Sequence, residues 1–540
     1  MTDIDHKSIL IDRVTARLSR RGFLKGAGAA AATAAVAGAG AFPGAAGAAG
    51  ASGQKHIVLA WVKHVDTLDP HFTGFTEAIK IINNIHNGLL KVTYDGKKVS
   101  FAPDLAESWE IHDDRVHTFR LRPDVKFHDG APCDAEAVKF SLERVKSGQP
   151  RSPHAWKLDL LEKIEIIDPL TIRLTFSKPY AFLPVALTGS TGRAGAVVSP
   201  AAVAKYGKDY GRNPVGTGPF RFVSWRENAT IELEKNPDYF EPGLPKLDRV
   251  TIRLMPEAST AAAALLSGQV HGMSDCPPMF VQQMKANPNL NVYGEVEGNY
   301  FYLGMNCRRG PFADPNLRRA VAYAIDRQAM IRQAFFGQGI PAVTPISPPM
   351  TDFYDPDVAK SGRGQYYDLE KAKAYRAKVA DQGVIQPVFV VSEQGAFGSR
   401  IAQTALPMLE KIGIRPKIEL VERASWVSRR NSGDFDMIDF GWEADLDPDE
   451  TLYPEFRTGS PWNFWGWSNP KFDALCAAAQ STLDTPTRRK LYYEAEDILL
   501  DEPPVALLTH MPIFKVFSKR VKGFQYVPVD LLDLHTVSLD

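Results

Sequence analysis

Strand and helix patterns alternate along this chain, and the alternation predicts an α/β fold. The apolar run 388–391 and the run 417–421 are typical of strands, and the segment 400–412 between them has the apolar period of a helix. About 490 residues follow the first 51, which is more than one hydrophobic core usually holds. We therefore expect two or three lobes.

The same two periods predict the individual elements in order. Alternating and β-branched runs, such as Thr171–Phe176, predict strands at 56–61, 118–122, 171–176, 220–223, 250–254, 388–391 and 417–421. Apolar residues three or four apart, as in the segment that follows the suitable N-cap Asp134, predict helices at 77–90, 134–147, 259–267, 316–334, 400–412, 473–483 and 486–501.

Residues 19–25 read Ser-Arg-Arg-Gly-Phe-Leu-Lys and precede an Ala/Gly-rich run, 27–50, that has no charged residue. The run is too weakly apolar to span a membrane, and Pro43 interrupts it. A basic segment, a mildly apolar run and small residues near 46–51 are typical of a cleaved signal, and the twin arginine indicates export of a folded protein by the Tat machinery. Residues 1–51 are thus predicted to be a twin-arginine signal peptide; the alternative is a low-complexity linker.

Charge and cysteine usage limit the partners and the compartment. Without residues 1–51 the chain keeps 57 basic and 60 acidic residues, a balance that does not favour nucleic acid. No later stretch is apolar enough to span a bilayer, and no cysteine precedes Cys133, so we expect a soluble periplasmic protein without a lipid anchor. Disulfides and buried free thiols both remain open for the four cysteines, Cys133, Cys276, Cys307 and Cys476.

The motifs that mark many enzymes do not occur in the sequence. It has no His-Glu-x-x-His, no phosphate loop ending in Gly-Lys-Ser/Thr and no Gly-x-Ser-x-Gly. Its twelve histidines are scattered and lack the spacing of metal ligands. We therefore predict no cofactor, no metal and no enzymatic activity, with a secreted hydrolase as a remote alternative.

The densest acidic run is 443–450, and aromatic residues flank it at 440–442 and 462–467. Carboxylates among aromatic rings suit an ammonium group, through ion pairing and cation–π attraction. The run begins like a calcium loop, but Glu450 replaces the glycine at position six and Phe456 the glutamate at position twelve. The run therefore predicts a site for a cationic group, with a solvated loop as the alternative.

Six blocks of residues, in order along the mature chain, resemble the extracytoplasmic solute-binding proteins of family 5. This is the peptide/nickel/opine class, which serves ATP-binding-cassette (ABC) importers. The blocks are TLDP (67–70) with NGLL (87–90), PDLAESW (103–109), FRLRPDVKFHDG (119–130), PVGTGPF (214–220), NPDYF (236–240) and DPNLRRAVAYAID (314–326). Each block is weak by itself, but six in the right order are specific.

The resemblance implies a periplasmic-binding-protein-like fold, with two lobes that close on a cleft and an inserted third subdomain. It places the signal at 1–51, the first lobe at 52–90, 210–295 and 501–540, the insert at 91–209 and the second lobe at 296–500. It also implies a function: a periplasmic receptor, expected to be a monomer, that binds a small peptide and delivers it to an ABC permease in the inner membrane. A cationic amine or opine, or a metal chelate, is the alternative ligand.

The resemblance also implies four ligand-binding residues. In peptide receptors of this family an aspartate just after a Gly-Trp pair binds the α-ammonium group, and Asp445 takes that position after Trp442. Trp426 corresponds to a tryptophan that lines the same pocket. Glu443 departs from the family pattern, as does Asp439, which replaces an arginine of the oligopeptide receptors. The added acid favours a cationic ligand.

Overall fold

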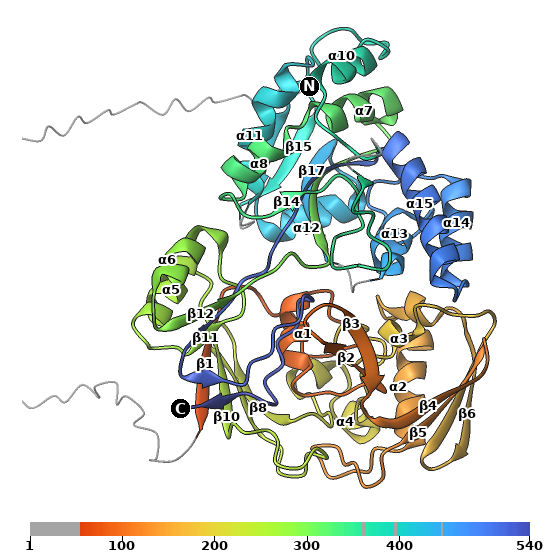
Figure 1. Ribbon diagram of the computed structural model, residues 1–540, viewed down its shortest axis with the longest axis vertical. Coiled ribbons are helices and arrows are strands. Elements are labelled where there is room, and N and C mark those ends of the chain that lie inside the picture. The colour runs from red at the N-terminus through yellow and green to blue at the C-terminus, as the bar shows by residue number, and fades with distance from the viewer. Residues whose placement is uncertain (1–54, 359–362, 394–396, 444–446) are drawn as a thin grey trace, which may run out of the picture. The chain divides into compact units, whose positions relative to one another are not determined.

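The computed structural model describes residues 55–540 except 359–362, 394–396 and 444–446. The predicted signal peptide and the candidate ligand residue Asp445 therefore lie outside the described residues. The three largest sheets have seven, six and four strands (Figure 1). Among the described helices, none has the length and apolar character needed to cross a membrane.

The seven-stranded sheet combines strands from the beginning, the middle and the end of the described chain. Its order is β12-β19-β11-β1-β10-β9-β8, and its strands are β1 (His56–Trp61), β8 (Phe220–Arg226), β9 (Thr230–Lys235), β10 (Arg249–Leu254), β11 (Gly272–Met273), β12 (Leu290–Tyr293) and β19 (Lys515–Ser518). Strand β1 is parallel to both of its neighbours and buried on both faces, with Ile57 and Leu59 in one apolar cluster and Ala60 in another. Helices α1 (Thr76–Ile82), α5 (Ala258–Leu266) and α6 (Val281–Ala286) complete this lobe.

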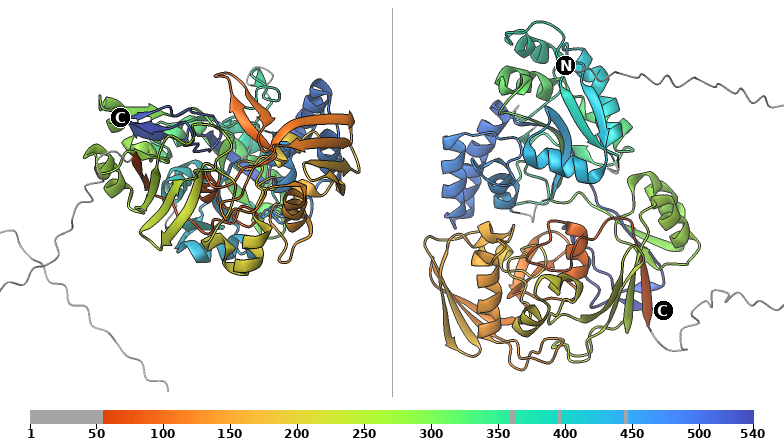
Figure 2. Two further views of the ribbon diagram at one scale, coloured as in Figure 1. Left: turned by 90° about the horizontal axis from the view of Figure 1, so that it is seen from below. Right: turned by 180° about the vertical axis from the view of Figure 1, so that it is seen from behind.

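The six-stranded sheet forms the second lobe. Its order is β14-β18-β13-β17-β15-β16, and its strands are β13 (Asn299–Met305), β14 (Ile340–Pro341), β15 (Val388–Ser392), β16 (Lys417–Val421), β17 (Met437–Glu443) and β18 (Val505–His510). Side chains of β13 alternate between two cores, with Leu303 in one and Tyr302 in the other. Its helices are α7 (Pro315–Ala324), α8 (Arg327–Ala334), α10 (Leu369–Arg376), α11 (Gly398–Glu410), α12 (Arg423–Ser432), α13 (Pro448–Phe456), α14 (Pro470–Gln480) and α15 (Thr485–Asp501). Figure 2 shows α14 and α15 packed side by side.

A third subdomain lies between α1 and β8 in the chain. Its antiparallel sheet has the order β4-β5-β7-β6, and its elements are β4 (Ala106–Asp113), β5 (Val116–Leu121), α2 (Ala135–Ser147), η1 (Ala155–Leu158), β6 (Leu161–Asp168), β7 (Thr171–Phe176), α3 (Leu183–Ala186), α4 (Pro200–Tyr206) and η2 (Gly207–Arg212). Helix α2 packs on β6 and β7, and its predicted cap forms, since Asp134 accepts a hydrogen bond from the amide of Ala137 at 3.1 Å. A hairpin of β2 (Leu90–Tyr94) and β3 (Val99–Pro103) precedes this sheet.

Two chain crossings join the seven-stranded and six-stranded sheets. The first, 294–298, connects β12 to β13, and the second, 511–514, connects β18 to β19. They lie side by side, because the amide of Glu297 donates to the carbonyl of Met511 at 3.3 Å. The side-chain amide of Asn299 binds both the carbonyl and the N–H of Met511, at 3.0 and 2.8 Å. This paired crossing is where a hinge movement between lobes would occur.

Two predicted helices are shorter in the structure. The helix predicted at 316–334 is divided into α7 and α8, because Asp326 caps the second helix by accepting from the amide of Ala329 at 2.9 Å. The helix predicted at 77–90 ends at Ile82. There the side chain of Asn84 donates to the carbonyl of Lys80 at 2.9 Å, a bond that competes with continued helix.

The last part of the first lobe is expected at 501–540, and two strands of this segment belong to different sheets. Strand β18 (Val505–His510) pairs with β13 in the six-stranded sheet, and the chain returns to the first lobe only at β19. The sequence of a buried strand does not show which of two similar sheets it joins.

A buried arginine connects α15 to the acidic run that begins α13. Arg488 binds Asp447 with two hydrogen bonds of 2.8 and 2.7 Å, and it binds Asp449 at 2.9 Å. The hydroxyl of Tyr492 donates to Asp449 at 2.5 Å. All four side chains are buried. These acidic residues therefore support the packing of the second lobe.

We expect Arg488→Met to lower the free energy of unfolding by about 3–5 kcal/mol, because Asp447 and Asp449 would remain buried without their cation. Urea denaturation at pH 7 measures this effect. The matched control is Lys490→Met on the same helix, an exposed position where the change should stay within about 0.5 kcal/mol. Equal stabilities of the two variants would contradict the structural role of Arg488.

Candidate functional site

Strand β17 carries three of the residues named from the sequence. Its side chains alternate, so that Phe440 and Trp442 pack into the aromatic core while Asp439 and Glu443 point to the opposite face. In the antiparallel pairing with β13, Glu443 lies opposite Asn299, the residue that binds the second crossing. The end of β17 is therefore at the junction of the two lobes.

The Glu443 side chain contacts the first lobe directly. Its carboxylate accepts a hydrogen bond from the hydroxyl of Thr76, the first residue of α1. Burial and the nearby carboxylate of Asp530 raise the pKa of Glu443 to about 7, while Lys63 and Lys80 act in the opposite direction. One residue of the second lobe thus faces several charged groups of the first.

A series of buried ion pairs runs from this point to the crossings. The ammonium nitrogen of Lys80 lies 2.6 Å from both Asp275 and Asp530. The ammonium nitrogen of Lys515 lies 3.6 Å from Asp530 and 3.2 Å from Glu297, which belongs to the first crossing. Both lysine side chains are fully buried. The charges around Glu443 and the hinge therefore form one connected group.

Carboxylates outnumber lysines in this connected group. With the Lys63–Glu77 pair of 2.7 Å, the described part of the group has three lysines and five carboxylates: Lys63, Lys80 and Lys515, with Glu77, Asp275, Glu297, Glu443 and Asp530. Burial raises the pKa of Glu297 to about 7 as well. Excess buried negative charge is costly, so this place favours either bound protons or an added cationic group.

The two predicted tryptophans belong to one aromatic cluster. Trp442 is 8% exposed, and its indole N–H donates to the carbonyl of Glu450 at 2.9 Å. Trp426, on α12, is 2% exposed and stacks on Phe440 with ring centres 5.7 Å apart and 12° between the planes. Trp442 therefore retains more accessible surface than Trp426, which has little left for a ligand.

Trp462, the first residue of the aromatic run 462–467, is a further candidate for the site. It lies perpendicular to Trp442, with ring centres 5.7 Å apart, and it is half-buried. A side-chain carbon placed on Gly74 of the first lobe would lie 4.0 Å from the Cη2 atom of Trp462. The aromatic run 462–467 was visible as a signal, but only the fold shows that its first tryptophan reaches across the junction.

The acidic run 443–450 is divided among different tasks. Asp447 and Asp449 pair with Arg488, and Glu450 lies 2.9 Å from Lys157 of the inserted subdomain. The described residues of this run are mostly buried, so they do not form the solvated loop that was the alternative. Within the ranges that the structure describes, no group of three or more His, Cys, Asp or Glu side chains could hold a metal ion.

The inserted subdomain provides another contact beside the acidic run. The fully buried Lys157 reaches Glu450 from η1, and the ring of Trp156 lies 6.2 Å from the ring of Tyr453 on α13. The amide of Ala181 donates to the carbonyl of Gln480 at 3.0 Å. Strand β17 therefore ends against the first lobe, and α13 contacts the insert.

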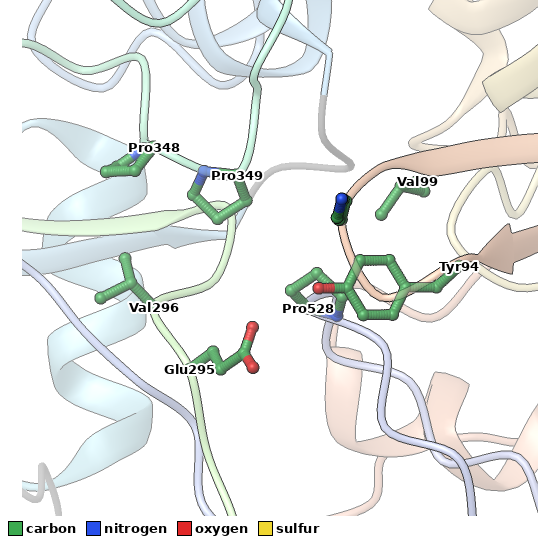
Figure 3. A pocket seen from close by; sticks show the side chains of 8 residues that line it. Tyr94, Val99, Glu295, Val296, Pro348, Pro349 and Pro528 are labelled. Carbon is green, nitrogen blue, oxygen red and sulfur yellow. The ribbon is translucent and has the colours of Figure 1, made fainter. Parts of the chain in front are cut away.

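A cavity of about 270 Å³ lies beside the first crossing, and Trp426, Trp442 and Glu443 are not among the residues that line it. The β2–β3 hairpin, the first crossing and a loop of the second lobe surround it, with Tyr94, Lys97, Val99, Glu295, Val296, Pro348, Pro349 and Pro528 as its lining. Figure 3 shows the hydroxyl of Tyr94 and the carboxylate of Glu295 pointing toward the space between hairpin and crossing. Because its walls come from several segments at the hinge, lobe movement would change its shape.

The structure decides between the two states left open for the cysteines. Cys133, Cys276, Cys307 and Cys476 are free thiols, and all but Cys307 are buried. Burial raises the pKa of the Cys307 thiol to about 11 and that of Cys276 to about 12. These thiols are therefore protonated at neutral pH and act as small apolar side chains.

Two lobes joined by a double crossing, with charged and aromatic residues gathered at their junction, are the features of a protein that closes on a solute. A family model of the bacterial extracellular solute-binding proteins, family 5, matches residues 100–464. The chain belongs to this family.

Individual relatives cover nearly the whole chain. The glutathione-binding protein GsiB of Salmonella paratyphi A is 30% identical over 486 residues, which are 88% of this chain and 92% of the relative. The periplasmic binding protein DppA of Helicobacter pylori, solved with the peptide STSA, has a TM-score of 0.81 and 27% identity over 90% of this chain and 98% of its own. The binding protein AgaA of A. tumefacien R10, solved with agropinic acid, has a TM-score of 0.79 and 27% identity over 90% and 99%.

These similarities confirm the family and the α/β periplasmic-binding-protein fold predicted from the sequence, and they confirm a solute-binding function of the type that serves ABC importers. The relatives are solute-binding proteins rather than enzymes. The domain limits and the ligand-binding roles of Asp445, Trp442, Trp426 and Glu443 stay predictions.

We expect Glu443→Gln to flatten the pH dependence of stability. The pKa of Glu443 is raised from 4.5 to about 7 in the folded protein, so its contribution is complete below pH 4.5 and is lost as the pH rises through 7. The free energy of unfolding of the wild type, relative to the variant, should therefore fall between about pH 5 and 8. Urea denaturation across this range tests it. The exposed Glu162→Gln is the control, and an equal slope for Glu443→Gln and wild type would refute the assignment.

Proposed function

We propose that this protein is the periplasmic substrate-binding component of an ABC importer, which binds a small peptide and delivers it to the membrane permease. The α-ammonium group of the peptide would pair with Asp445 and Glu443, and its first residues would contact Trp442. Closure of the two lobes would exclude water and strengthen these ionic contacts.

The excess of carboxylates around Glu443 is the observation that carries this proposal. The group has two more carboxylates than lysines, and an arriving ammonium group would favour the charged form of these carboxylates. Similarity to a glutathione-binding protein and to a binding protein solved with a peptide supports a peptide ligand in particular.

A cationic solute such as an amine or an opine is the second candidate. The same carboxylates favour it, and the similarity to a protein solved with agropinic acid supports it. A peptide and an opine differ in the backbone amides that only the peptide offers for hydrogen bonding along a strand edge. A comparison of the two ligand types therefore separates these candidates.

We also propose export as a folded protein by the Tat machinery, directed by residues 1–51. The mature protein would work as a monomer in the periplasm without a lipid anchor. Its first lobe would contain 52–90 and 210–295 together with the chain from Lys515 onward, and its insert would contain 91–209. The second lobe would begin near 296 and continue through β18.

Thermal-shift measurements with free tripeptides, glutathione, mannopine, spermidine and a nickel–histidine complex test the proposed ligand class. A solute present at a hundred times its Kd should raise the free energy of unfolding by roughly 2.7 kcal/mol. We expect the tripeptides or glutathione to give the largest shift. A shift with mannopine alone would replace the peptide by an opine.

We expect Asp445→Asn to weaken peptide binding by about 30-fold or more, because the ammonium group would lose a charged partner in a water-poor site. Isothermal titration calorimetry at pH 7 measures this. Asp238→Asn is the matched control, since Asp238 is exposed in the first lobe, whereas Asp449 is unsuited because it pairs with Arg488. Equal affinities of the Asp445 and Asp238 variants would remove Asp445 from the site.

A further inference from the structure

We infer that Arg423 and Arg430, on one face of α12, bind the terminal carboxylate of the peptide. This inference rests on the proposed peptide-binding function. It implies that the C-terminal end of the peptide carries a free carboxylate. The position at which the oligopeptide receptors have an arginine is Asp439 here, so the carboxylate needs another partner.

The spacing along α12 brings the two arginines together. Residues 423, 426 and 430 are three and four positions apart and so lie on the same face of a helix. The Arg423 guanidinium lies over the ring of Trp426, 4.8 Å from its centre, and the Arg430 guanidinium lies 5.3 Å from the same centre. One buried indole therefore contacts both cations.

Neither arginine has an acidic partner among the described residues. Arg430 donates only to the side-chain oxygen of Asn431, at 3.0 and 2.9 Å, and no ion pair of Arg423 exists in the described chain. The neighbouring Arg429, by contrast, pairs with Glu419 at 2.8 Å and with Asp434 at 3.1 Å.

Arg430 is also partly buried against aromatic rings. Its guanidinium lies 4.2 Å from the centre of the Phe464 ring and 5.2 Å from that of Phe440. Burial and the adjacent Arg423 lower the pKa of Arg430 to about 10. A partly desolvated cation with no acidic partner among the described residues would gain from an anionic group of a ligand.

A series of ring contacts connects Arg430 to the lobe junction. Phe464, which the guanidinium covers, lies 6.1 Å from the ring of Trp462, and Trp462 approaches Gly74 of the first lobe. Phe440, under Arg430, lies on the same face of β17 as Trp442, two residues and about 7 Å along the strand. The two arginines therefore lie on the side of β17 that carries Trp442, about the length of a dipeptide from it.

Asp439 is the acidic residue that could compete for these arginines. It forms no ion pair with either of them, and one of its carboxylate oxygens is buried without a hydrogen bond. Burial raises the pKa of Asp439 to about 7, which Arg423 opposes. Near neutral pH this carboxyl group is therefore partly protonated, which leaves the two cations available for a stronger acid.

The test compares two synthetic tripeptide libraries, one with free C-terminal carboxylates and one with C-terminal amides, on the full mature chain. Thermal shift against concentration at pH 7 gives an apparent midpoint for each library. We expect the midpoint of the free-acid library to lie at least about 30-fold below that of the amide library, because one end of the amide lacks its charge. This comparison needs no variant.

Variants of the two arginines then test whether these residues cause the difference between the two midpoints. Arg423→Met with Arg430→Met should raise the free-acid midpoint to that of the amide library and leave the amide midpoint unchanged. The double change to lysine should keep part of the discrimination, since it retains the charge. Arg429→Met is the matched control on the same helix, and its two midpoints should equal those of the wild type.

Two results would overturn the inference while peptide binding stands: equal midpoints of both libraries on the wild type, or unchanged discrimination in the double methionine variant. If neither library shifts the wild type, the proposed peptide function fails and the inference fails with it.

Discussion

Strand β13 leaves the first crossing at Asn299, and its antiparallel pairing with β17 brings Glu443 to the same place. Backbone pairing sets the register of every residue on both strands. A movement of β13 at the first crossing would therefore also move β17 and its aromatic side chains. Glu443, which we propose binds the ligand, thus lies one strand away from the segment about which the lobes would turn. The proposed binding residue and the proposed hinge therefore share one pair of strands.

Charged side chains are buried both at this junction and inside the second lobe. The Arg488 group has one cation and two carboxylates, joined by hydrogen bonds as expected of a buried ionic group that supports packing. The group around Lys80 and Glu443 has more carboxylates than lysines, and the α12 arginines have no acidic partner in the described chain. The group around Glu443 has an excess of acidic side chains, and the α12 arginines are basic. A zwitterionic peptide would complement both charges.

Local signals were sufficient for much of the fold. Thr171–Phe176 is a strand over its full predicted length, and Asp134 caps its helix, because alternation and capping depend on near neighbours. Longer predictions failed where a distant partner intervened. The carbonyl of Leu532, far along the chain, accepts from the side chain of Asn84 at 2.7 Å just after the point where α1 ends. The period of apolar residues continues there although the helix does not.

Residue order and composition are enough to predict the family, the α/β class and the presence of carboxylates among aromatic residues. Which of those residues act together follows from the three-dimensional arrangement alone. It assigned Asp447 and Asp449 to Arg488, buried Trp426 under its neighbours and brought Trp462 to the first lobe. The physical reason is that ion pairing and burial depend on what is adjacent in space, and the partners here come from segments far apart in the chain.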